Sequence, residues 1–169
     1  MNVLINNAGF QQPENLLNQQ EDLTDAESTI TTNLLGLIRI TAALLPLLMK
    51  QSTSAIVNVT SGLAFLPMSG VPTYCATKAA MHSYTVSLRR QLKSMNTEVI
   101  ELIPPYVQTG LGPNHGADPM AMPLTAFISE VMEILRRNPK IAEVVVEQCK
   151  PLRFASERGQ FDTLFSKLN

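Results

Sequence analysis

Four short apolar segments rich in β-branched residues are spaced along the chain, and polar or turn-forming residues follow each of them. These segments are Val3–Ile5, Ala55–Val59, Glu98–Ile103 and Ala142–Val146. Largely continuous apolar runs of this length are typical of strands that are buried on both faces of a sheet. The pattern therefore predicts a parallel sheet of four strands.

Longer segments with helical periodicity lie between and after these strands, at about Thr24–Lys50, Thr73–Lys93 and Leu124–Arg137. Thr24 and Glu27 match a capping box at the start of the first helix. The glycine- and proline-rich segment 108–123 predicts a loop of the kind that often lies over an active site. Strands that alternate with helices indicate the α/β class, here as one domain over residues 1–169.

The composition excludes several function classes. Thirteen basic residues against fourteen acidic ones create no field that would attract nucleic acid or an anionic membrane. Cys75 and Cys149, with only two histidines, are too few for a disulfide scaffold or a metal site, so we expect reduced thiols and no metal. The longest apolar stretch, Ile38–Met49, is too short to span a bilayer and contains Pro46, and no signal peptide precedes it. We therefore expect a soluble, cytoplasmic protein.

Tyr74 and Lys78 are the first candidates for chemistry. In the segment YCATK they lie four residues apart in a predicted helix, which places them on one face about one turn apart. An ammonium beside a phenol favours the phenolate, so we expect a lowered pKa for Tyr74 and a role as general acid/base. A Tyr-x-x-x-Lys pair alone is a weak signal that also occurs on solvated helix faces. The nearby Cys75 and His82 are interpreted as packed or partly exposed helix residues.

Polar and small residues follow three of the predicted strands. Asn6–Gly9 (NNAG) follows the first strand, Ser61 (NVTSG) the second and Thr109 (PPYVQTG) the third. In open α/β sheets, ligands bind just outside the carboxyl ends of the strands. A Ser61 hydroxyl there can donate to a carbonyl oxygen, although it can also cap a turn. Together the three strand ends predict one site at this edge of the sheet.

In this order and spacing, NNAG, NVTSG, YCATK and the Pro-x-x-Val-x-Thr motif resemble the classical short-chain dehydrogenases/reductases, from Met1 to about Thr109. The segments VTSGLAFLPM, IPPYVQT and ERGQFDTLFSKLN are most similar to the DltE-type oxidoreductases of that family. The resemblance implies a Rossmann-like, doubly wound parallel sheet. It also implies an enzyme that transfers hydride between NAD or NADP and a small carbonyl or secondary alcohol substrate. With the preceding strands of that fold absent, Val3–Ile5 would form an open apolar edge, so we expect a homo-oligomer.

The resemblance also implies residue roles. Tyr74 matches the catalytic acid/base, and Lys78 matches the residue that lowers the tyrosine pKa and binds the nicotinamide ribose. Ser61 matches the residue that orients the substrate oxygen, and Asn33 matches the one that holds a water in the proton relay. The positions implied to bind the cofactor are Asn7, Ala8, Gly9, Tyr74, Lys78, Pro104, Val107 and Thr109.

The sequence departs from the family pattern in two places. Pro105 stands where many relatives have glycine, which stiffens the backbone and removes an amide donor. No Gly-rich turn of the TGxxxGxG type occurs, although such a turn normally holds the dinucleotide pyrophosphate at a helix N-terminus. We therefore expect only the C-terminal, catalytic half of the domain, with the first βαβαβ half missing and dinucleotide affinity weaker than millimolar. The alternative is a truncated, inactive relative that serves, if at all, as an interaction module.

Overall fold

The computed structural model describes residues 1–17, 22–111 and 118–169. At its centre lies a parallel sheet with the strand order β1-β2-β3-β4. The strands are β1 (Val3–Asn6), β2 (Ser54–Val59), β3 (Thr97–Ile103) and β4 (Glu143–Val145). Each strand begins and ends within one residue of the bounds predicted from the sequence, because β-branched runs are a strong strand signal.

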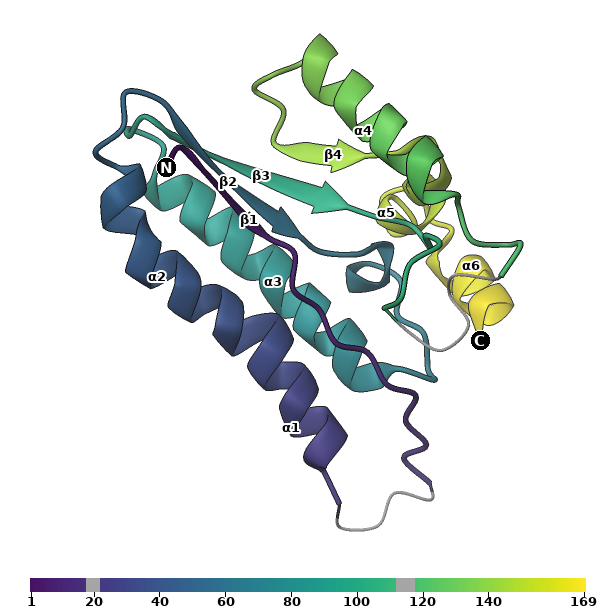
Figure 1. The fold of residues 1–169 in the computed structure, drawn as a ribbon. Coiled ribbons are helices and arrows are strands. Elements are labelled where there is room, and N and C mark those ends of the chain that lie inside the picture. The colour runs from purple at the N-terminus through teal and green to yellow at the C-terminus, as the bar shows by residue number, and fades with distance from the viewer. Residues whose placement is uncertain (18–21, 112–117) are drawn as a thin grey trace.

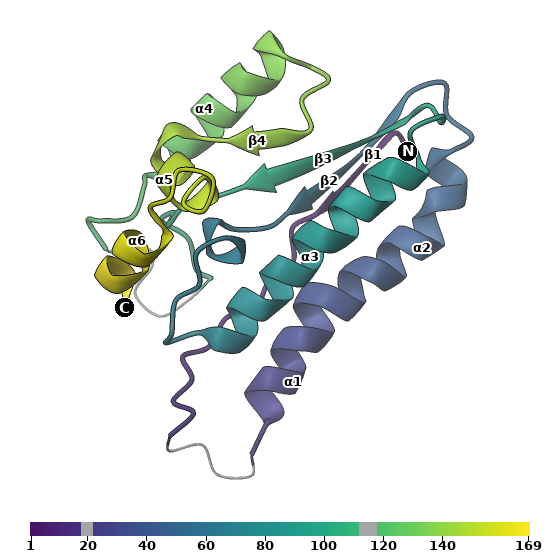
Figure 2. The same ribbon diagram turned by 180° about the vertical axis from the view of Figure 1, so that it is seen from behind.

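Helices cover both faces of this sheet (Figures 1 and 2). On one face lie α3 (Pro72–Gln91) and a continuous rod formed by α1 (Thr24–Ile30), the π-helical turn η1 (Thr31–Gly36) and α2 (Leu37–Leu48). The opposite face is covered by α4 (Leu124–Arg137). The predicted Rossmann-like, doubly wound α/β fold is therefore confirmed.

The first long helix differs from its prediction at its N-terminal end. No capping box forms, because α1 begins after Leu23 without a side-chain cap, and the Thr24 amide instead donates to Asp22 Oδ1 at 2.9 Å. The helix runs through Pro46 to Leu48, close to its predicted end at about Lys50. By length and composition alone, the 25-residue helix Thr24–Leu48 could cross a membrane. The short length of Ile38–Met49 therefore does not exclude a membrane span for the whole helix. One side of the helix packs against α3 and β1.

Four short elements complete the fold, and the sequence predicted none of them. They are η2 (Gly62–Ala64), η3 (Glu147–Cys149), α5 (Lys150–Arg153) and α6 (Phe161–Leu168). Helices of one or two turns are too short to establish a hydrophobic period, so they escape pattern analysis. They lie beyond the carboxyl ends of the strands (Figure 2), where η2 directly follows Ser61.

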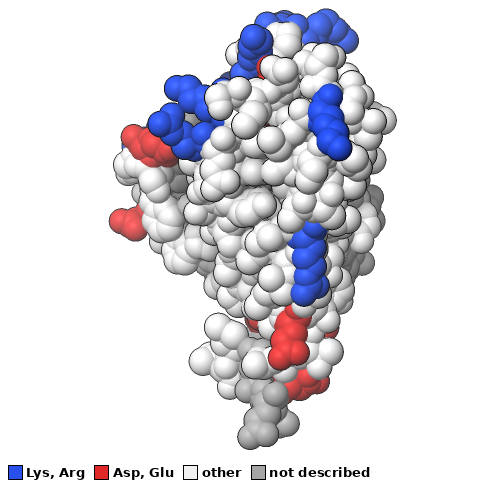
Figure 3. Space-filling model, turned by 90° about the vertical axis from the view of Figure 1, so that its left-hand side faces the viewer, with Lys and Arg blue, Asp and Glu red and all other residues white. Residues whose placement is uncertain are grey.

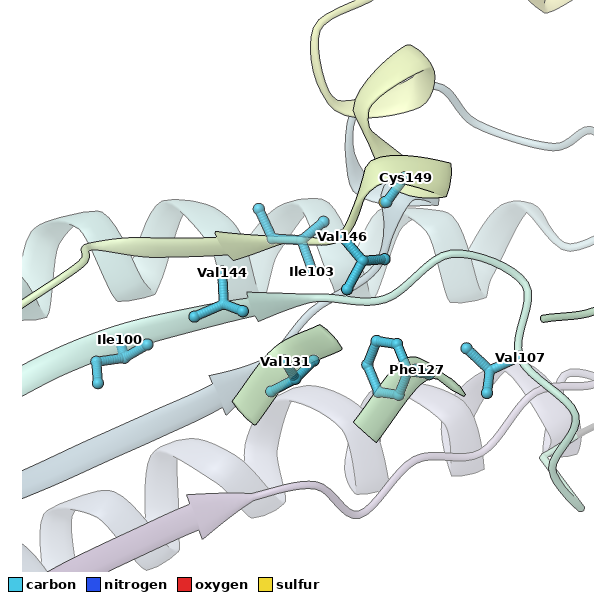
Figure 4. Close-up of a cluster of buried hydrophobic side chains, with 8 residues drawn as sticks. All are labelled: Ile100, Ile103, Val107, Phe127, Val131, Val144, Val146 and Cys149. Atoms are coloured by element: carbon cyan, nitrogen blue, oxygen red, sulfur yellow. The ribbon is translucent and has the colours of Figure 1, made fainter. Parts of the chain in front are cut away.

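Two apolar clusters lie on opposite faces of the sheet. Because successive strand residues point to opposite faces, the neighbours Val99 and Ile100 enter different clusters. The cluster to which α4 contributes Phe127 and Val131 consists of Ile100, Ile103, Val107, Phe127, Val131, Val144, Val146 and Cys149 (Figure 4). The cluster under α2 and α3 consists of Leu4, Leu48, Ile56, Leu88, Leu92 and Val99.

One step further along the strands, the face under α3 becomes polar. Asn6, Asn58, Glu101 and Glu143 are register partners across all four strands, and we call these four residues the polar row. Asn6 Nδ2 donates to Asn58 Oδ1 at 2.8 Å, and Asn58 Nδ2 donates to Thr85 Oγ1 of α3 at 2.9 Å. The polar row therefore separates the apolar cluster on this face from the carboxyl ends of the strands.

Candidate active site

Helix α3 and the end of β2 bring Tyr74, Lys78 and Ser61 together, as the sequence predicted. All three side chains are buried, and Ser61 is close enough to Tyr74 to lower the pKa of its hydroxyl. Lys78 Nζ donates to the carbonyl of Val59 at 2.8 Å and lies 5.6 Å from the centroid of the Tyr74 ring. The three polar groups therefore share one face of the sheet at the carboxyl end of β2.

The chain is tightly held where it leaves β2. Ser61 Oγ accepts the Leu63 amide at 3.1 Å, so it caps η2 while also contacting Tyr74. The Gly62 amide donates to the carbonyl of Pro104 at 2.9 Å. A Cβ atom at Gly62 would lie 2.8 Å from Leu152 Cδ1, so only glycine allows α5 to pack this closely. Both sequence interpretations of Ser61, turn cap and site residue, are compatible with this geometry.

The protonation of the pair differs from the sequence prediction. Burial raises the pKa of Tyr74 to about 12, and the Ser61 hydrogen bond offsets this only in part. Burial also lowers the pKa of Lys78 to about 8. The expected lowering of the Tyr74 pKa by Lys78 is therefore wrong, because burial disfavours the charged form of each group. Near neutral pH, Tyr74 holds its proton and Lys78 is largely charged.

Asn33 lies fully buried in the π-helical turn η1. Its Oδ1 accepts the Phe10 amide at 2.7 Å, and its Nδ2 donates to the Phe10 carbonyl at 2.9 Å and to Thr77 Oγ1 at 3.1 Å. These bonds tie η1 to the segment after β1 and to α3, next to Lys78. Single π-helical turns frequently occur at functional sites. The water-holding role of Asn33 stays a prediction.

The residues predicted to bind the cofactor flank Tyr74 and Lys78 at the same edge. Asn7, Ala8 and Gly9 follow β1 with exposed side chains and backbone. After β3, Pro104 accepts the Gly62 amide, Val107 is buried, and Thr109 Oγ1 accepts the Leu111 amide at 3.3 Å. The cofactor-binding role of these two segments stays a prediction. The predicted loop 108–123 lies partly outside the described residues, since 112–117 are not among them.

A second group of ionisable residues was missed by the sequence analysis. His82, Glu101 and Glu143 place potential ligand atoms within 4.8 Å of one another. They come from three elements, so no sequence motif links them, and the one available signal was a carboxylate inside the apolar strand β3. Glu143 accepts two bonds from Arg153, at 2.8 and 3.1 Å, and Glu101 accepts one from Thr60 at 2.7 Å. These pairings make the group an ionic network within the fold rather than an open ligand set.

Both cysteines are free and buried, in agreement with the expectation of packed thiols. Burial raises the pKa of the Cys75 thiol, and it raises that of Cys149 to about 12. A thiol with a raised pKa is a poor nucleophile. Cys75 is therefore a packing residue beside Tyr74.

Comparison with known proteins identifies the family. The short chain dehydrogenase family matches residues 1–119 of the chain. The chain belongs to this family of oxidoreductases. Over its whole length it is 38% identical to the uncharacterized oxidoreductase DltE of Bacillus subtilis (strain 168), of which it spans 68%. It is also 31% identical, over 85% of its length, to a 3-oxoacyl-[acyl-carrier-protein] reductase of Synechocystis, of which it spans 60%.

The solved structures lead to the same fold. A short-chain dehydrogenase from Sphingobium yanoikuyae in complex with NADPH matches the whole chain with a TM-score of 0.75 and 26% sequence identity. The chain spans 66% of that protein. The parallel sheet with its flanking helices is therefore the arrangement found in this family.

Proposed function

We propose that the protein transfers hydride between a nicotinamide dinucleotide and a carbonyl or secondary alcohol substrate. The observation that carries this proposal is the buried Tyr74 side chain, which has Ser61 beside it and Lys78 Nζ 5.6 Å from its ring centroid, at the carboxyl ends of the strands. Membership of an oxidoreductase family favours this function over the alternative of an interaction module without activity.

The arrangement supports one role for each side chain in carbonyl reduction. The Ser61 hydroxyl donates a hydrogen bond to the substrate oxygen, and Tyr74 transfers its phenolic proton to the same oxygen as negative charge develops there. A pKa of about 12 keeps that proton on Tyr74 until the oxygen becomes strongly basic. The nearby Lys78 ammonium stabilises the phenolate that remains. The dinucleotide, when bound, supplies or accepts the hydride, and in alcohol oxidation the proton moves in the opposite direction.

NADP(H) is the proposed dinucleotide, supported by the NADPH complex of the Sphingobium relative. The segments 7–9 and 104–109, together with Tyr74 and Lys78, would hold its nicotinamide end. Since the sequence contains no Gly-rich turn for the pyrophosphate, the affinity of this chain is proposed to be weaker than millimolar. The Synechocystis relative, a 3-oxoacyl reductase, makes 3-oxo thioesters the first substrates to test.

The test is turnover by the full chain with NADPH at several millimolar and an acetoacetyl thioester, followed by the loss of NADPH absorbance. We expect turnover that Tyr74→Phe reduces by about 10²- to 10⁴-fold, the usual contribution of a general acid. Tyr84→Phe is the matched control, because Tyr84 lies on the same helix but packs into the apolar cluster under α2 and α3. An inactive wild-type chain, across a panel of aldehydes and ketones with both dinucleotides, would reject the proposed function.

The proposal includes self-association and a cytoplasmic location. The Thr24–Leu48 rod carries the exposed apolar residues Ile30, Ile40 and Leu47. Uncharged residues cover most of the side of the molecule that Figure 3 shows. A second copy of the chain would bury this surface. In sedimentation, Ile40→Glu should shift an oligomer toward monomer, whereas Ser156→Glu, on an exposed turn, should not.

The proposed cytoplasmic location is supported by the two free cysteines, because thiols stay reduced in a reducing compartment.

A further inference from the structure

Glu101 places a fully buried carboxylate in the middle of the sheet, with none of its surface exposed. Burial of a carboxylate is costly unless both of its oxygens are paired. Here Thr60 Oγ1 donates to Oε1 at 2.7 Å, while His82 Nδ1 lies 2.9 Å from Oε2 and 3.1 Å from Oε1. The carboxylate is therefore held by one partner from the end of β2 and one from α3.

Both partners adjoin the reacting groups. Thr60 stands between Val59, whose carbonyl accepts the Lys78 ammonium, and Ser61. The Thr60 amide also donates to the Leu102 carbonyl at 2.9 Å. His82 lies on α3 one turn beyond Lys78 and two turns beyond Tyr74, on the same helix face. The Glu101 carboxylate thus joins the strand end that carries Ser61 to the helix that carries Tyr74.

The surroundings of His82 limit its freedom to move. The edge of its ring contacts Phe65, with 4.7 Å between the ring centroids, and the Arg153 guanidinium lies 4.3 Å from the centroid of the same Phe65 ring. Arg153 in turn pairs with Glu143, the register partner of Glu101 in the polar row. The partly exposed imidazole therefore contacts Phe65 on one side and the Glu101 carboxylate on another, and both contacts limit its rotation.

We propose that Glu101, with His82 and Thr60, acts as a positioning group that sets the place of the Ser61 hydroxyl relative to Tyr74. This inference rests on the proposed function, since it concerns the alignment of two groups that act on the same substrate oxygen. Without the Thr60–Glu101 bond, the segment 59–61 keeps its backbone bonds and the Lys78–Val59 bond, but it loses its link to α3 through Glu101 and His82. A displacement of about 1 Å at a reacting group is enough to reduce turnover up to 100-fold.

The test removes only the Thr60 hydroxyl. Thr60→Val keeps the shape of the side chain and should lower kcat between about 10- and 100-fold, with KM for NADPH nearly unchanged. Thr60→Ser restores the donor and should recover most of the lost kcat. Thr97→Val is the matched control, because the equally buried Thr97 makes a 2.9 Å hydrogen bond to Ser54 at the far end of the same strands. We expect it to leave kcat unchanged.

Amide hydrogen exchange at Gly62 and Leu63 provides a readout that does not depend on turnover. These amides donate to the Pro104 carbonyl and to Ser61 Oγ, so they report where Ser61 is held. Thr60→Val should raise their exchange several-fold relative to Thr97→Val. Unchanged exchange, or a kcat equal to that of wild type, would overturn the positioning proposal. An inactive wild-type chain would reject the proposed function alone, because the exchange measurement would still decide where Ser61 is held.

Discussion

The two faces of the sheet bury different kinds of side chain. Under α4, the buried cluster is apolar throughout and includes Phe127 and Val144 (Figure 4). Under α3, an apolar cluster at one end gives way to the polar row and to Lys78 at the other. Among the described residues, every buried side-chain nitrogen or oxygen has a hydrogen-bond partner. One face therefore contributes mainly stability, and the other mainly the fixed placement of polar groups.

This difference follows from how each kind of contact contributes to folding. Apolar burial stabilises in proportion to area, at roughly 25 cal/mol per Å². Buried polar pairs return little net free energy, yet the loss of one partner is expensive. Substitutions under α4 should therefore change stability alone, whereas those under α3 should separate stability from activity.

The largest effect is expected under α4. Phe127→Ala removes a buried ring from the apolar cluster and should lower the free energy of unfolding by about 3–5 kcal/mol in urea titrations. Phe127→Leu, which keeps most of the volume, should cost less than half as much. The folded fraction should keep its turnover. A Phe127→Ala variant as stable as wild type would show that this face does not carry the stability.

Lys78→Met should raise the free energy of unfolding instead of lowering it. In the folded state burial lowers the pKa of Lys78 from 10.5 to about 8, so between these values the unfolded chain binds more protons. Wild-type stability should therefore rise with pH across this interval. Lys78→Met should lack that rise, be more stable near neutral pH by about 3 kcal/mol at most, and lose activity.

Urea unfolding at both ends of this pH interval measures the difference. Lys50→Met, at an exposed lysine, is the control and should retain the wild-type pH dependence. If Lys78→Met showed the same pH dependence as wild type, the buried ammonium would not be the cause.

A smaller loss of stability is expected for substitutions in the polar row. Asn58→Ala leaves Asn6 and Thr85 without their shared partner and should destabilise the protein by about 1–3 kcal/mol. Asn2→Ala, which removes an exposed bond to the Thr53 carbonyl, should have almost no effect. Equal unfolding midpoints for the two variants would contradict the importance of pairing within the row.

The smallest change in stability is expected at the edge strand β1. Val3 and Ile5 are 52% and 60% exposed, and an apolar strand edge is a template for pairing with other chains. Ile5→Lys should change the free energy of unfolding by no more than about 0.5 kcal/mol. It should nevertheless reduce aggregation, measured by light scattering at rising protein concentration. Ile5→Val is the control, and equal scattering by the two variants would argue against edge pairing.

The sequence predicted those parts of the fold and site that rest on local patterns. Apolar strands and the spacing of Tyr74 and Lys78 depend on neighbours within a few residues, and the rule for strand ends then located Ser61 correctly. The Glu101–His82 contact could not be predicted in this way, because it joins a strand to a helix 19 residues away. The pKa of Tyr74 was missed for a related reason: burial is a property of the packed structure.

The parallel order of the strands also has a consequence for how the chain folds. Each ladder joins residues more than forty positions apart, as in Val3 with Ala55, Ser54 with Thr97, and Glu101 with Glu143. No strand can pair with a neighbour through a short turn, so the entropy of closing large loops opposes every step of sheet formation. The chain should therefore fold slowly for its size. The polar row, which needs all three ladders, can be completed only when the last of them has closed.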